Sequence, residues 1–221
     1  MDEGPVWRVT NGIFPSNCYV VGTGTAGECF LVDPGLDPAP IEAALAELRL
    51  RPQAICCTHG HFDHAGSAAV LQRRYDCPVY LDEADAKTLR SSNFLLMAFK
   101  IPARTELPST LGVRELDFEI RIGDRQVVYH PTPGHTPGSC MIECGSSLFT
   151  GDTLYSRGVG LSKLPGENAE QLRRSILSMW DRFAADVTVH PGHGDSARLD
   201  WVKLHNHALL QFLQLQPAPQ A

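Results

Sequence analysis

The sequence predicts an α+β fold built as a four-layer sandwich of helix, sheet, sheet and helix. Three observations lead to this prediction: strand-like apolar stretches gather in two parts of the chain, each part also contains stretches with helical apolar spacing, and no clean linker separates the parts. Outer helices on two stacked sheets would let both parts share one core. The 221 residues can bury such a core, so we expect a single domain over residues 1–221.

The first half begins with short strands separated by glycine-rich turns, expected at residues 6–10, 17–21 and 29–32. Between Pro38 and Leu48 apolar residues recur one helical turn apart, which predicts a helix. The apolar run 54–57 indicates a buried strand. It is followed by a helix at about 64–75, a strand at 79–81 and a helix at 83–90.

The second half repeats this pattern, with strands expected near residues 119–122, 127–130, 139–143 and 147–150. A helix is predicted at about 168–183, where Leu172, Ile176 and Trp180 belong to one apolar stripe. A last strand at 188–190 and a terminal helix at 200–215 complete the fold. Residues 216–221 are predicted to form a flexible tail.

Charge and hydropathy exclude two classes of partner. The 19 Lys and Arg against 25 Asp and Glu give a net charge of −6 without a basic stripe, so nucleic acid is not an expected partner. The longest apolar candidate for a membrane span, residues 94–101, is too short and contains Lys100. We therefore expect a small-molecule ligand and a monomer or homodimer.

The chain is predicted to be cytoplasmic. Its N-terminus, Met1-Asp2-Glu3-Gly4-Pro5, is acidic where a signal peptide would be basic and then apolar. The seven cysteines are an odd number and mostly lie in apolar, strand-like runs. This usage favours reduced, buried thiols in a reducing compartment over a disulfide framework.

The motif Thr58-His59-Gly60-His61-Phe62-Asp63-His64 concentrates four metal-ligating side chains in six positions, directly after a buried strand. We expect them on the loop at the end of that strand. Because alternate side chains of an extended chain point to the same face, His59 and His61 can share one ion. Asp63 and His64 are adjacent and point differently, which suits a second ion. The motif therefore predicts two metals.

Three further polar residues are expected at strand ends, each beside a glycine that permits a tight turn. They are His135 in Pro133-Gly134-His135, Asp152 in Gly151-Asp152 and His193 in Gly192-His193-Gly194. The other histidines, His130, His190, His205 and His207, lie outside these motifs and are expected to have packing or surface roles.

Taken together, these motifs resemble the metallo-β-lactamase superfamily from about residue 9 to 194, and within it the glyoxalase II group of hydroxyacyl-thiol hydrolases. The resemblance implies the αββα fold and two ion sites. His59, His61 and His135 would bind the first ion, and Asp63, His64 and His193 the second, with Asp152 bridging both. Asp33, in Val32-Asp33-Pro34-Gly35, matches an acid that orients ligands without binding metal.

The implied enzyme is a binuclear metallohydrolase whose predicted catalytic residues are Asp63 and Asp152. Two divalent ions ~3.5–4 Å apart can turn a shared water into hydroxide near neutral pH and polarise a carbonyl. We expect zinc, with iron or manganese as alternatives, because His/Asp sites accept all three. The expected reaction is hydrolysis of an acyl thioester by this hydroxide.

The bridging acid argues against a β-lactamase, since true β-lactamases of the superfamily lack it. Only 28 residues follow His193, which implies a short form without the C-terminal helical domain of glyoxalase II. Relatives commonly read Gly-x-Gly-Arg where this chain has Gly158-Val159-Gly160-Leu161. An arginine that could hold a glutathione carboxylate is thus missing, unless Arg157 or Lys163 replaces it. Small or apolar acyl thioesters are therefore expected to be better substrates than glutathione thioesters.

Several alternatives stay open. A mono-iron persulfide dioxygenase of the same superfamily would use His59, His135 and Asp152, a ligand set that suits oxygen-activating iron. A lactone or other ester hydrolase would use the same hydroxide, and a non-catalytic scaffold is disfavoured because every ligand is present. The apolar stretch 92–102 can form a lid or acyl pocket, a dimer contact or plain core.

Overall fold

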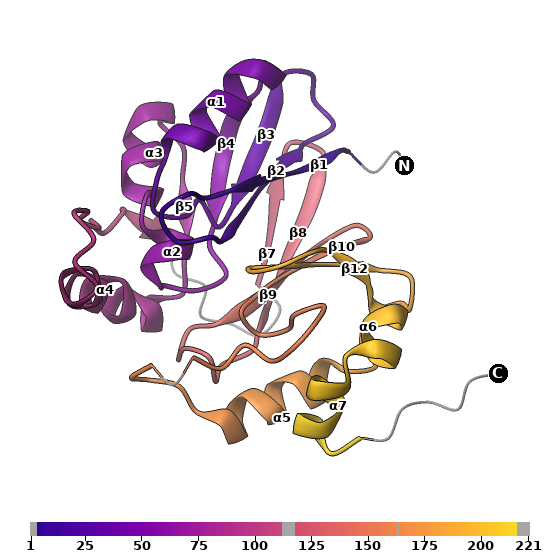
Figure 1. Cartoon of the computed structure of the whole chain (residues 1–221). Coiled ribbons are helices and arrows are strands. Elements are labelled where there is room, and N and C mark those ends of the chain that lie inside the picture. Colours follow the sequence, from indigo (N-terminus) through magenta and orange to yellow (C-terminus); the bar gives the residue numbers. More distant parts are fainter. Residues whose placement is uncertain (1–3, 112–117, 163, 216–221) are drawn as a thin grey trace.

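The computed structural model describes residues 4–111, 118–162 and 164–215. Two six-stranded sheets stack face to face, and helices cover the outer side of each sheet (Figure 1). This arrangement confirms the predicted four-layer αββα fold. The predicted tail 216–221 lies outside the described residues.

The first sheet has the strand order β1-β2-β3-β4-β5-β6. Its strands are β1 (Val6–Thr10), β2 (Asn17–Gly22), β3 (Glu28–Val32), β4 (Arg51–Cys56), β5 (Val79–Tyr80) and β6 (Thr110–Leu111). The first three strands pair antiparallel, and β3 to β6 pair parallel. The accompanying helices are α1 (Ala39–Leu48), α2 (Phe62–Ala65), α3 (Ala68–Tyr75), the 3₁₀ turn η1 (Glu83–Asp85) and α4 (Ala86–Ala98).

The second sheet has the order β12-β11-β10-β9-β8-β7. Its strands are β7 (Phe118–Ile122), β8 (Arg125–Pro131), β9 (Cys140–Cys144), β10 (Ser147–Gly151), β11 (Thr188–Pro191) and β12 (Ala197–Arg198). Strands β10 and β11 are parallel, and the other neighbours are antiparallel. Helices α5 (Ala169–Met179), α6 (Leu199–His205) and α7 (His207–Leu213) cover its outer face.

Alternation along the central strands builds the layers. On β2, Val20 packs outward against the helices α1 and α3, whereas Tyr19 packs inward against the second sheet. Leu31 and Phe30 on β3 divide in the same way, since successive strand residues point to opposite faces. A strand that is covered on both faces needs apolar residues on both, which explains the nearly continuous apolar runs of β2 and β3.

The predicted helix 64–75 is wrong at its beginning. Helix α2 already starts at Phe62, so Asp63 and His64 lie on a helical turn and not on a loop. The chain then breaks before α3, because the Ser67 amide donates to the Gly35 carbonyl (2.8 Å) and leaves the helical hydrogen-bond ladder. This contact joins α2 to the turn that follows β3.

Two other helices differ from prediction. The helix expected to end at residue 90 continues as α4 to Ala98, so part of the apolar stretch 92–102 is helical. The terminal helix is divided at Asn206, whose side-chain oxygen accepts from the Leu209 amide (3.1 Å) and caps α7. Strands β6 and β12 were not predicted, because each has only two residues and, unlike β5, neither belongs to an apolar run of the sequence.

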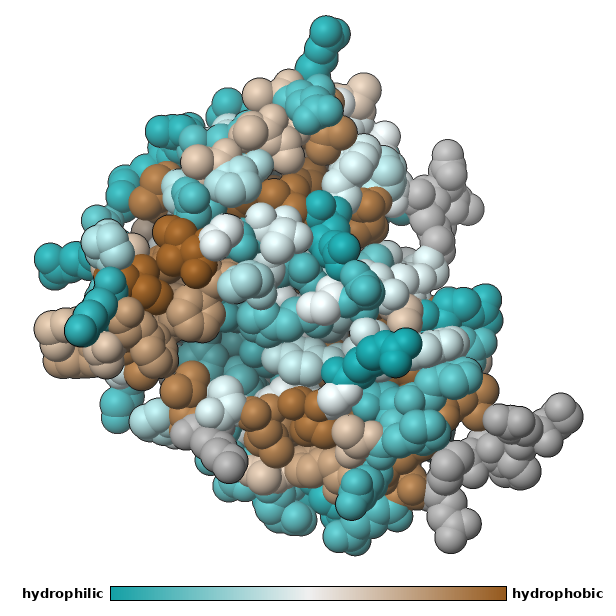
Figure 2. Space-filling view, viewed as in Figure 1, coloured by the Kyte–Doolittle hydropathy of each residue, from teal (hydrophilic) through white to brown (hydrophobic). Residues whose placement is uncertain are grey.

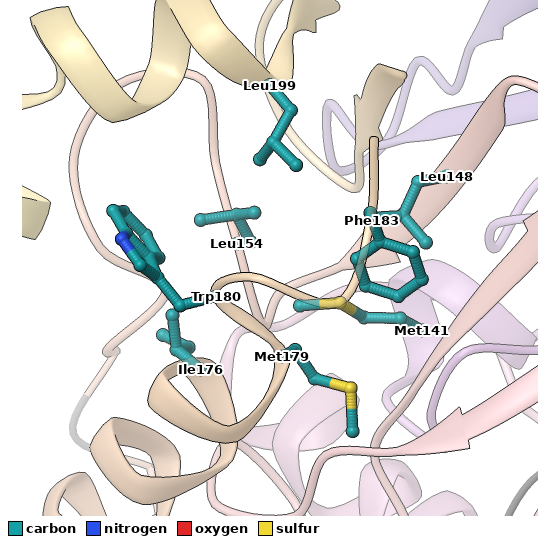
Figure 3. A pocket seen from close by; sticks show the side chains of 8 residues that line it. All are labelled: Met141, Leu148, Leu154, Ile176, Met179, Trp180, Phe183 and Leu199. Carbon is teal, nitrogen blue, oxygen red and sulfur yellow. The ribbon is translucent and has the colours of Figure 1, made fainter. Parts of the chain in front are cut away.

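A small apolar cavity lies between the second sheet and helices α5 and α6 (Figure 3). Its volume is about 10 Å³, and only apolar side chains such as Met141, Ile176 and Phe183 line it. A void of this size holds one water at most, so it is a packing defect and not a substrate site.

Among the described residues, no helix combines the length and apolarity that crossing a membrane requires.

Candidate metal centre

The seven predicted ligands meet at one rim of the sandwich, where strands of both sheets end. His59 and His61 follow β4, and Asp63 and His64 belong to α2. His135 lies between β8 and β9, Asp152 directly follows β10, and His193 lies in the loop between β11 and β12. All are buried except His193, whose side chain is 30% exposed. Residues far apart in the sequence are thereby assembled into one cluster.

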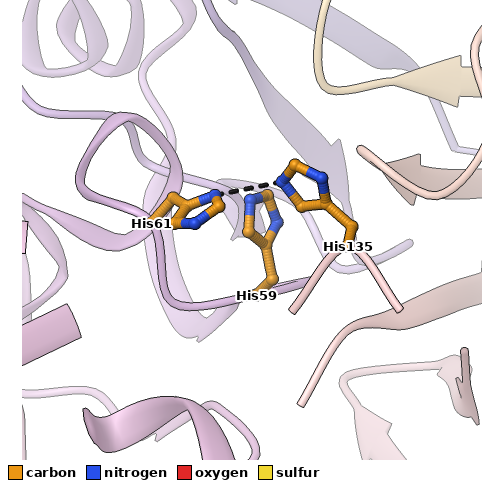
Figure 4. Close-up of side chains that lie close together, drawn as sticks. All are labelled: His59, His61 and His135. Atoms are coloured by element: carbon orange, nitrogen blue, oxygen red, sulfur yellow. Dashed lines mark hydrogen bonds between the residues drawn. The ribbon is translucent and has the colours of Figure 1, made fainter. Parts of the chain in front are cut away.

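One group consists of His59, His61 and His135, and we call it the three-histidine group (Figure 4). Its ring centroids are 4.8 to 4.9 Å apart. The Nδ1 atom of His61 lies 3.0 Å from Nε2 of His135. Three imidazoles that point at one another in this way can ligate a single ion. The expectation that His59 and His61 point to the same side is met.

A second group consists of Asp63, His64 and His193, and we call it the mixed group. Nε2 of His193 lies 3.4 Å from Nε2 of His64 and 3.4 Å from an Asp63 carboxylate oxygen. The same Asp63 oxygen lies 3.6 Å from Nε2 of His64. The helical turn of α2 lets these adjacent residues converge, although an extended chain would have separated them.

Asp152 lies between the two groups. Its carboxylate is 3.4 Å from Nε2 of His135 on one side, and on the other 3.4 Å from Nε2 of His64 and 3.5 Å from Nε2 of His193. The carboxylate is 7% exposed. One acid thus contacts both groups, which is the placement expected of a bridging ligand.

Hydrogen bonds at Nδ1 leave Nε2 of two imidazoles free for a ligand role. His135 Nδ1 donates to the Gly160 carbonyl (2.9 Å), and His193 Nδ1 donates to the Pro15 carbonyl (2.7 Å). A neutral imidazole that donates from Nδ1 carries its lone pair on Nε2. In both residues Nε2, which carries the lone pair when the ring is neutral, faces the cluster.

Asp33 organises two more imidazoles from behind. It follows β3 in a left-handed conformation (φ 50°), and its Oδ2 lies 3.1 Å from His64 Nδ1. It also accepts from the Thr58 amide and hydroxyl, both at 2.7 Å. Because the Thr58 hydroxyl proton is used on Asp33, the Thr58 oxygen accepts from His59 Nδ1 (3.0 Å).

Replacing Asp33 with Asn is expected to weaken metal binding without eliminating it. An amide cannot accept at both positions, so His64 and, through Thr58, His59 lose their fixed orientation. Such partners typically change metal affinity or activity ~10–100-fold. Competition with a chelator measures the affinity, and Thr58→Ser, which keeps the hydroxyl, is the control. Direct bonding of Asp33 to an ion at ~2.0–2.2 Å in a zinc-loaded crystal would contradict this role.

Orphaned polar atoms test whether the residues fit metal ions. Within the described residues, Nε2 of His59 and Oδ1 of Asp152 are buried without a hydrogen-bond partner. Burying such atoms unsatisfied costs about 1–3 kcal/mol each, more for a charged group. Both atoms face the cluster of imidazoles and carboxylates. Coordination to cations would satisfy them, so the donor set fits two divalent ions.

The electrostatics divide the histidines into two classes. Burial lowers the pKa of His64 and His193, but the carboxylates of Asp152 and Asp63 outweigh burial and raise the pKa to about 9 for His64 and about 11 for His193. Burial and neighbouring imidazoles instead lower the pKa of His59, and that of His61 to about 4. At pH 7 without metal, His64 and His193 therefore carry imidazolium charge, whereas His59 and His61 are neutral.

Metal loading at pH 7 is expected to release about two protons from the imidazoles of the mixed group, in addition to any proton lost by metal-bound water, because ligating imidazoles must be neutral. His64 and His193 have raised pKa values, so each gives up a proton, whereas His59 and His61 are already neutral. Calorimetric titration with zinc in buffers of different ionisation enthalpy measures this number. His193→Ala should lower it by about one. Loading without proton release would show that the mixed group does not bind the ion.

Sequence reasoning missed Asp85, a fully buried carboxylate at the start of α4. Its oxygens accept from the amides of Gly60 (2.7 Å) and Gly138 (2.9 Å) and from the hydroxyl of Thr136 (2.6 Å). Gly60 separates His59 from His61, and Thr136 follows His135. Asp85 thus ties together the two loops that carry the three-histidine group.

Both glycines are required by this close approach. A Cβ on Gly60 would collide with the Asp85 backbone carbonyl, and one on Gly138 would lie 2.8 Å from the Asp85 carboxyl carbon. A local pattern could not identify Asp85, since its partners are 25 to 53 residues away. The two glycines beside predicted ligands were the available signal that something packs closely there.

The histidines left outside the predicted site do not join it. His130 pairs with Glu143 (2.8 Å), His190 stacks on Phe149, and His205 stacks on Trp201.

The seven cysteines are free and buried, as expected, and none belongs to a potential metal group among the described residues. Arg157 lies over the Trp201 ring (5.0 Å), and Lys163 lies outside the described residues.

A cleft of about 410 Å³ opens beside His61. One wall is the face of η1 and α4 that carries Ala84, Lys87, Thr88, Ser91, Phe94 and Leu95, and the opposite wall is formed by Pro137, Leu164, Pro165 and Gly166. The apolar stretch is therefore divided between roles. Phe94 and Leu95 line the cleft, whereas Phe99 packs against Phe14 (5.9 Å) and Ile101 packs against the core around Phe62.

Comparison with protein families places these motifs in context. The family model described as Metallo-beta-lactamase superfamily matches residues 11–194, which include all seven predicted ligands. An uncharacterized protein of Aquifex aeolicus is 31% identical over 192 residues, covering 86% of this chain and 90% of the relative. A protein of Anaeromyxobacter dehalogenans named hydroxyacylglutathione hydrolase is 35% identical over 179 residues, covering 81% of this chain and 61% of the relative.

Solved structures show the same architecture. The crystal structure of BLEG-1, named a B3 metallo-beta-lactamase, has a TM-score of 0.84 and 28% identity, covering 93% of this chain and 99% of BLEG-1. TTHA1623, crystallised in a di-iron-bound form, has a TM-score of 0.75 and 33% identity, covering 89% of this chain and 96% of TTHA1623. By their names, the similar chains therefore include a hydroxyacylglutathione hydrolase, a B3 metallo-beta-lactamase and a protein crystallised in a di-iron-bound form.

Proposed function

Because this chain belongs to the metallo-β-lactamase superfamily, we propose that it is a binuclear metal-dependent hydrolase that cleaves an acyl thioester, as a short glyoxalase II-like enzyme. The observation that carries the proposal is the Asp152 carboxylate, which lies 3.4 Å from His135 on one side and from His64 on the other. An acid in that place supports a shared centre for two ions.

In this proposal the three-histidine group would hold the first ion and the mixed group the second, and Asp152 would contribute its carboxylate to both. Two bound ions supply an activated water near neutral pH and an electrophile for the carbonyl. The residues of this chain keep the ligands in place: Asp33 orients His64, and Asp85 joins the loops of His61 and His135. Hydrolysis breaks the C–S bond, adds the water hydroxyl to the acyl carbon and releases the thiol.

The cleft beside His61 supports a thioester with an apolar acyl group. Phe94, Leu95 and Pro137 contribute apolar surface, and sites that bind small molecules are mostly apolar with few polar anchors. Leu161 stands where relatives carry an arginine, and Arg157 is engaged with Trp201. Neither therefore offers a carboxylate clamp for glutathione, so we propose a different thiol carrier.

A β-lactamase activity is the second candidate, and the likeness to BLEG-1 favours it. The mono-iron dioxygenase stays a third, because His59, His135 and Asp152 lie together, as that ligand set requires. The mixed group distinguishes the dioxygenase from a hydrolase, since a mono-iron enzyme leaves Asp63, His64 and His193 without a metal. Metal stoichiometry and substrate turnover therefore separate all three.

The test measures metal content together with turnover of three substrates by one preparation. We expect two divalent ions per chain and a kcat/KM for a short acyl thioester well above those for lactoylglutathione and for a cephalosporin. A cephalosporin turned over faster than every thioester would assign the protein to the β-lactamases. One iron per active chain, with oxygen consumption on a persulfide, would assign it to the dioxygenases.

Phe94→Ala is expected to raise KM for a hexanoyl thioester about tenfold and to leave acetyl thioester kinetics nearly unchanged. Losing an aromatic wall removes apolar contact worth roughly 1.5 kcal/mol from a longer chain, but a two-carbon acyl group does not reach it. Phe99→Ala is the matched comparison, because Phe99 packs against Phe14 outside the cleft. Equal losses in the two variants would mean that the effect is structural.

A further inference from the structure

Helix α4 presents an exposed stripe that continues the wall of the cleft. Lys87, Arg90, Phe94 and Met97 follow one another at intervals of three or four residues and share one helix face. Phe94 is 71% exposed and Met97 is 70% exposed, and Phe99 and Lys100 extend the stripe beyond the helix. Figure 2 shows apolar colour gathered on the left side of the molecule, where α4 lies in Figure 1. We call this surface the α4 face.

The α4 face is positively charged in an acidic protein. Residues 86–105 contain Lys87, Arg90, Lys100 and Arg104 and no acidic residue, although the chain has a net charge of −6. None of these four cations forms an ion pair with another described residue. Of the acidic residues that flank this segment, Asp85 is buried beneath the helix and Glu106 pairs with Arg73 (2.8 Å), whereas Glu83 is exposed four residues before Lys87.

This charge pattern argues against a second copy as the occupant. A two-fold contact through α4 would bring the same cations of two chains together, and like charges at an interface are repulsive. Exposed aromatic and Met side chains beside unpaired basic ones instead complement a surface that is apolar and acidic. Phe94 belongs both to the α4 face and to the cleft, so an occupant of the face lies directly beside the route to His61.

We propose that the α4 face docks an acidic carrier protein that presents the acyl thioester on a flexible arm, which enters the cleft. This inference rests on the thioesterase function proposed above and names the thiol carrier. The carrier's acidic surface contacts Arg90 and Lys100, and its apolar side chains cover Met97. The arm then brings the thioester carbonyl past Phe94 to the metal centre.

The test compares one acyl group on two thiols: a butyryl thioester of an acidic acyl carrier protein and butyryl-N-acetylcysteamine, which has no protein part. At low ionic strength kcat/KM is expected to be at least about tenfold higher for the carrier-bound substrate and to fall as salt is added. The double variant Arg90→Glu, Lys100→Glu should remove this advantage, while turnover of butyryl-N-acetylcysteamine changes less than about twofold. The control Arg198→Glu reverses an exposed charge on β12, away from α4.

A binding measurement separates failure of docking from failure of the thioesterase function. Docking needs no chemistry, so a fluorescent carrier loaded with a non-hydrolysable thioether should bind metal-free protein and lose affinity in the Arg90→Glu, Lys100→Glu variant. If neither thioester is hydrolysed, the proposed function is overturned, whatever the binding result. The docking proposal is overturned if kcat/KM is equal for the two thioesters. It is also overturned if Arg198→Glu lowers kcat/KM for the carrier-bound thioester as much as the Arg90→Glu, Lys100→Glu variant does. A third outcome would also overturn it: the protein is a dimer that Met97→Asp dissociates, while kcat/KM for the carrier-bound thioester stays unchanged.

Discussion

The Asp152→Ala variant is expected to lose hydrolysis by more than about a hundredfold, the upper end of what a merely orienting partner costs, while the fold is kept. The Asp152 carboxylate contacts imidazoles of both groups. Burial raises its pKa, but His64, His193 and the other imidazoles around it outweigh burial and hold the pKa well below the usual range. Alanine removes this carboxylate and with it the contacts to His135, His64 and His193. The two ions then lose their shared ligand.

Three measurements check this result: kcat/KM on the best thioester, metal content, and circular dichroism with a thermal melt. Asp152→Asn is the matched variant, because it keeps the shape but removes the negative charge. We expect it to fall between wild type and Asp152→Ala. Full activity of the alanine variant, or a wild-type enzyme active with one ion, would refute the binuclear centre and favour the mono-iron alternative.

The Asp85→Asn variant is expected to lose affinity for the ion of the three-histidine group and to destabilise the metal-free protein by about 3 kcal/mol. Whichever way the asparagine side chain turns, its amide nitrogen faces a backbone amide that donates to the native carboxylate, either that of Gly60 or that of Gly138. A buried donor left unsatisfied costs about 1–3 kcal/mol. With this join loosened, His61 and His135 are no longer held 3.0 Å apart, whereas the mixed group is supported by Asp33.

Cobalt binding followed by visible absorption distinguishes the two sites, because their ligand sets differ in charge and nitrogen count. The Asp85→Asn protein should lose the signature of the three-nitrogen site first, and Asp33→Asn that of the mixed site. Thr88→Val is the control, since it removes only a 3.2 Å bond to Asp85. Unfolding of the metal-free variants reports the structural cost separately. Unchanged affinities for both ions in Asp85→Asn would show that Asp85 serves stability alone.

Much of the fold was predictable because burial is encoded by local periodicity. The alternation of Val20 with Tyr19, and of Leu31 with Phe30, assigns each strand residue to one side of its sheet. Strands buried on both faces and helices with one apolar stripe then leave few ways to form a core. Elements of two residues, such as β6 and β12, carry no period and are defined only by their neighbours in the sheet.

The candidate site was predictable in its membership and not in its geometry. Residue chemistry and the neighbouring glycines identified all seven candidate ligands in advance, and the structure brings their side chains together. Asp63 and His64 lie on a helical turn that is closed by the Ala65 amide, which donates to the His61 carbonyl (2.9 Å), and this turn was not predicted. Which residues bind which ion stays a prediction.

The sequence by itself determined the layer architecture and the kind of atoms at the metal centre, since both follow from residue types at short, regular spacings. Only the tertiary structure decided that Asp85 joins two ligand loops and that His61 faces the cluster with Nδ1 whereas His135 faces it with Nε2. It also decided that α4 lines the cleft and exposes a basic, apolar stripe. The physical reason is the separation along the chain between residues that are in contact. A hydrogen bond or a cleft wall is made by residues that are close in space, and spacing along the chain carries no information about a partner that folding brings in from 50 residues away.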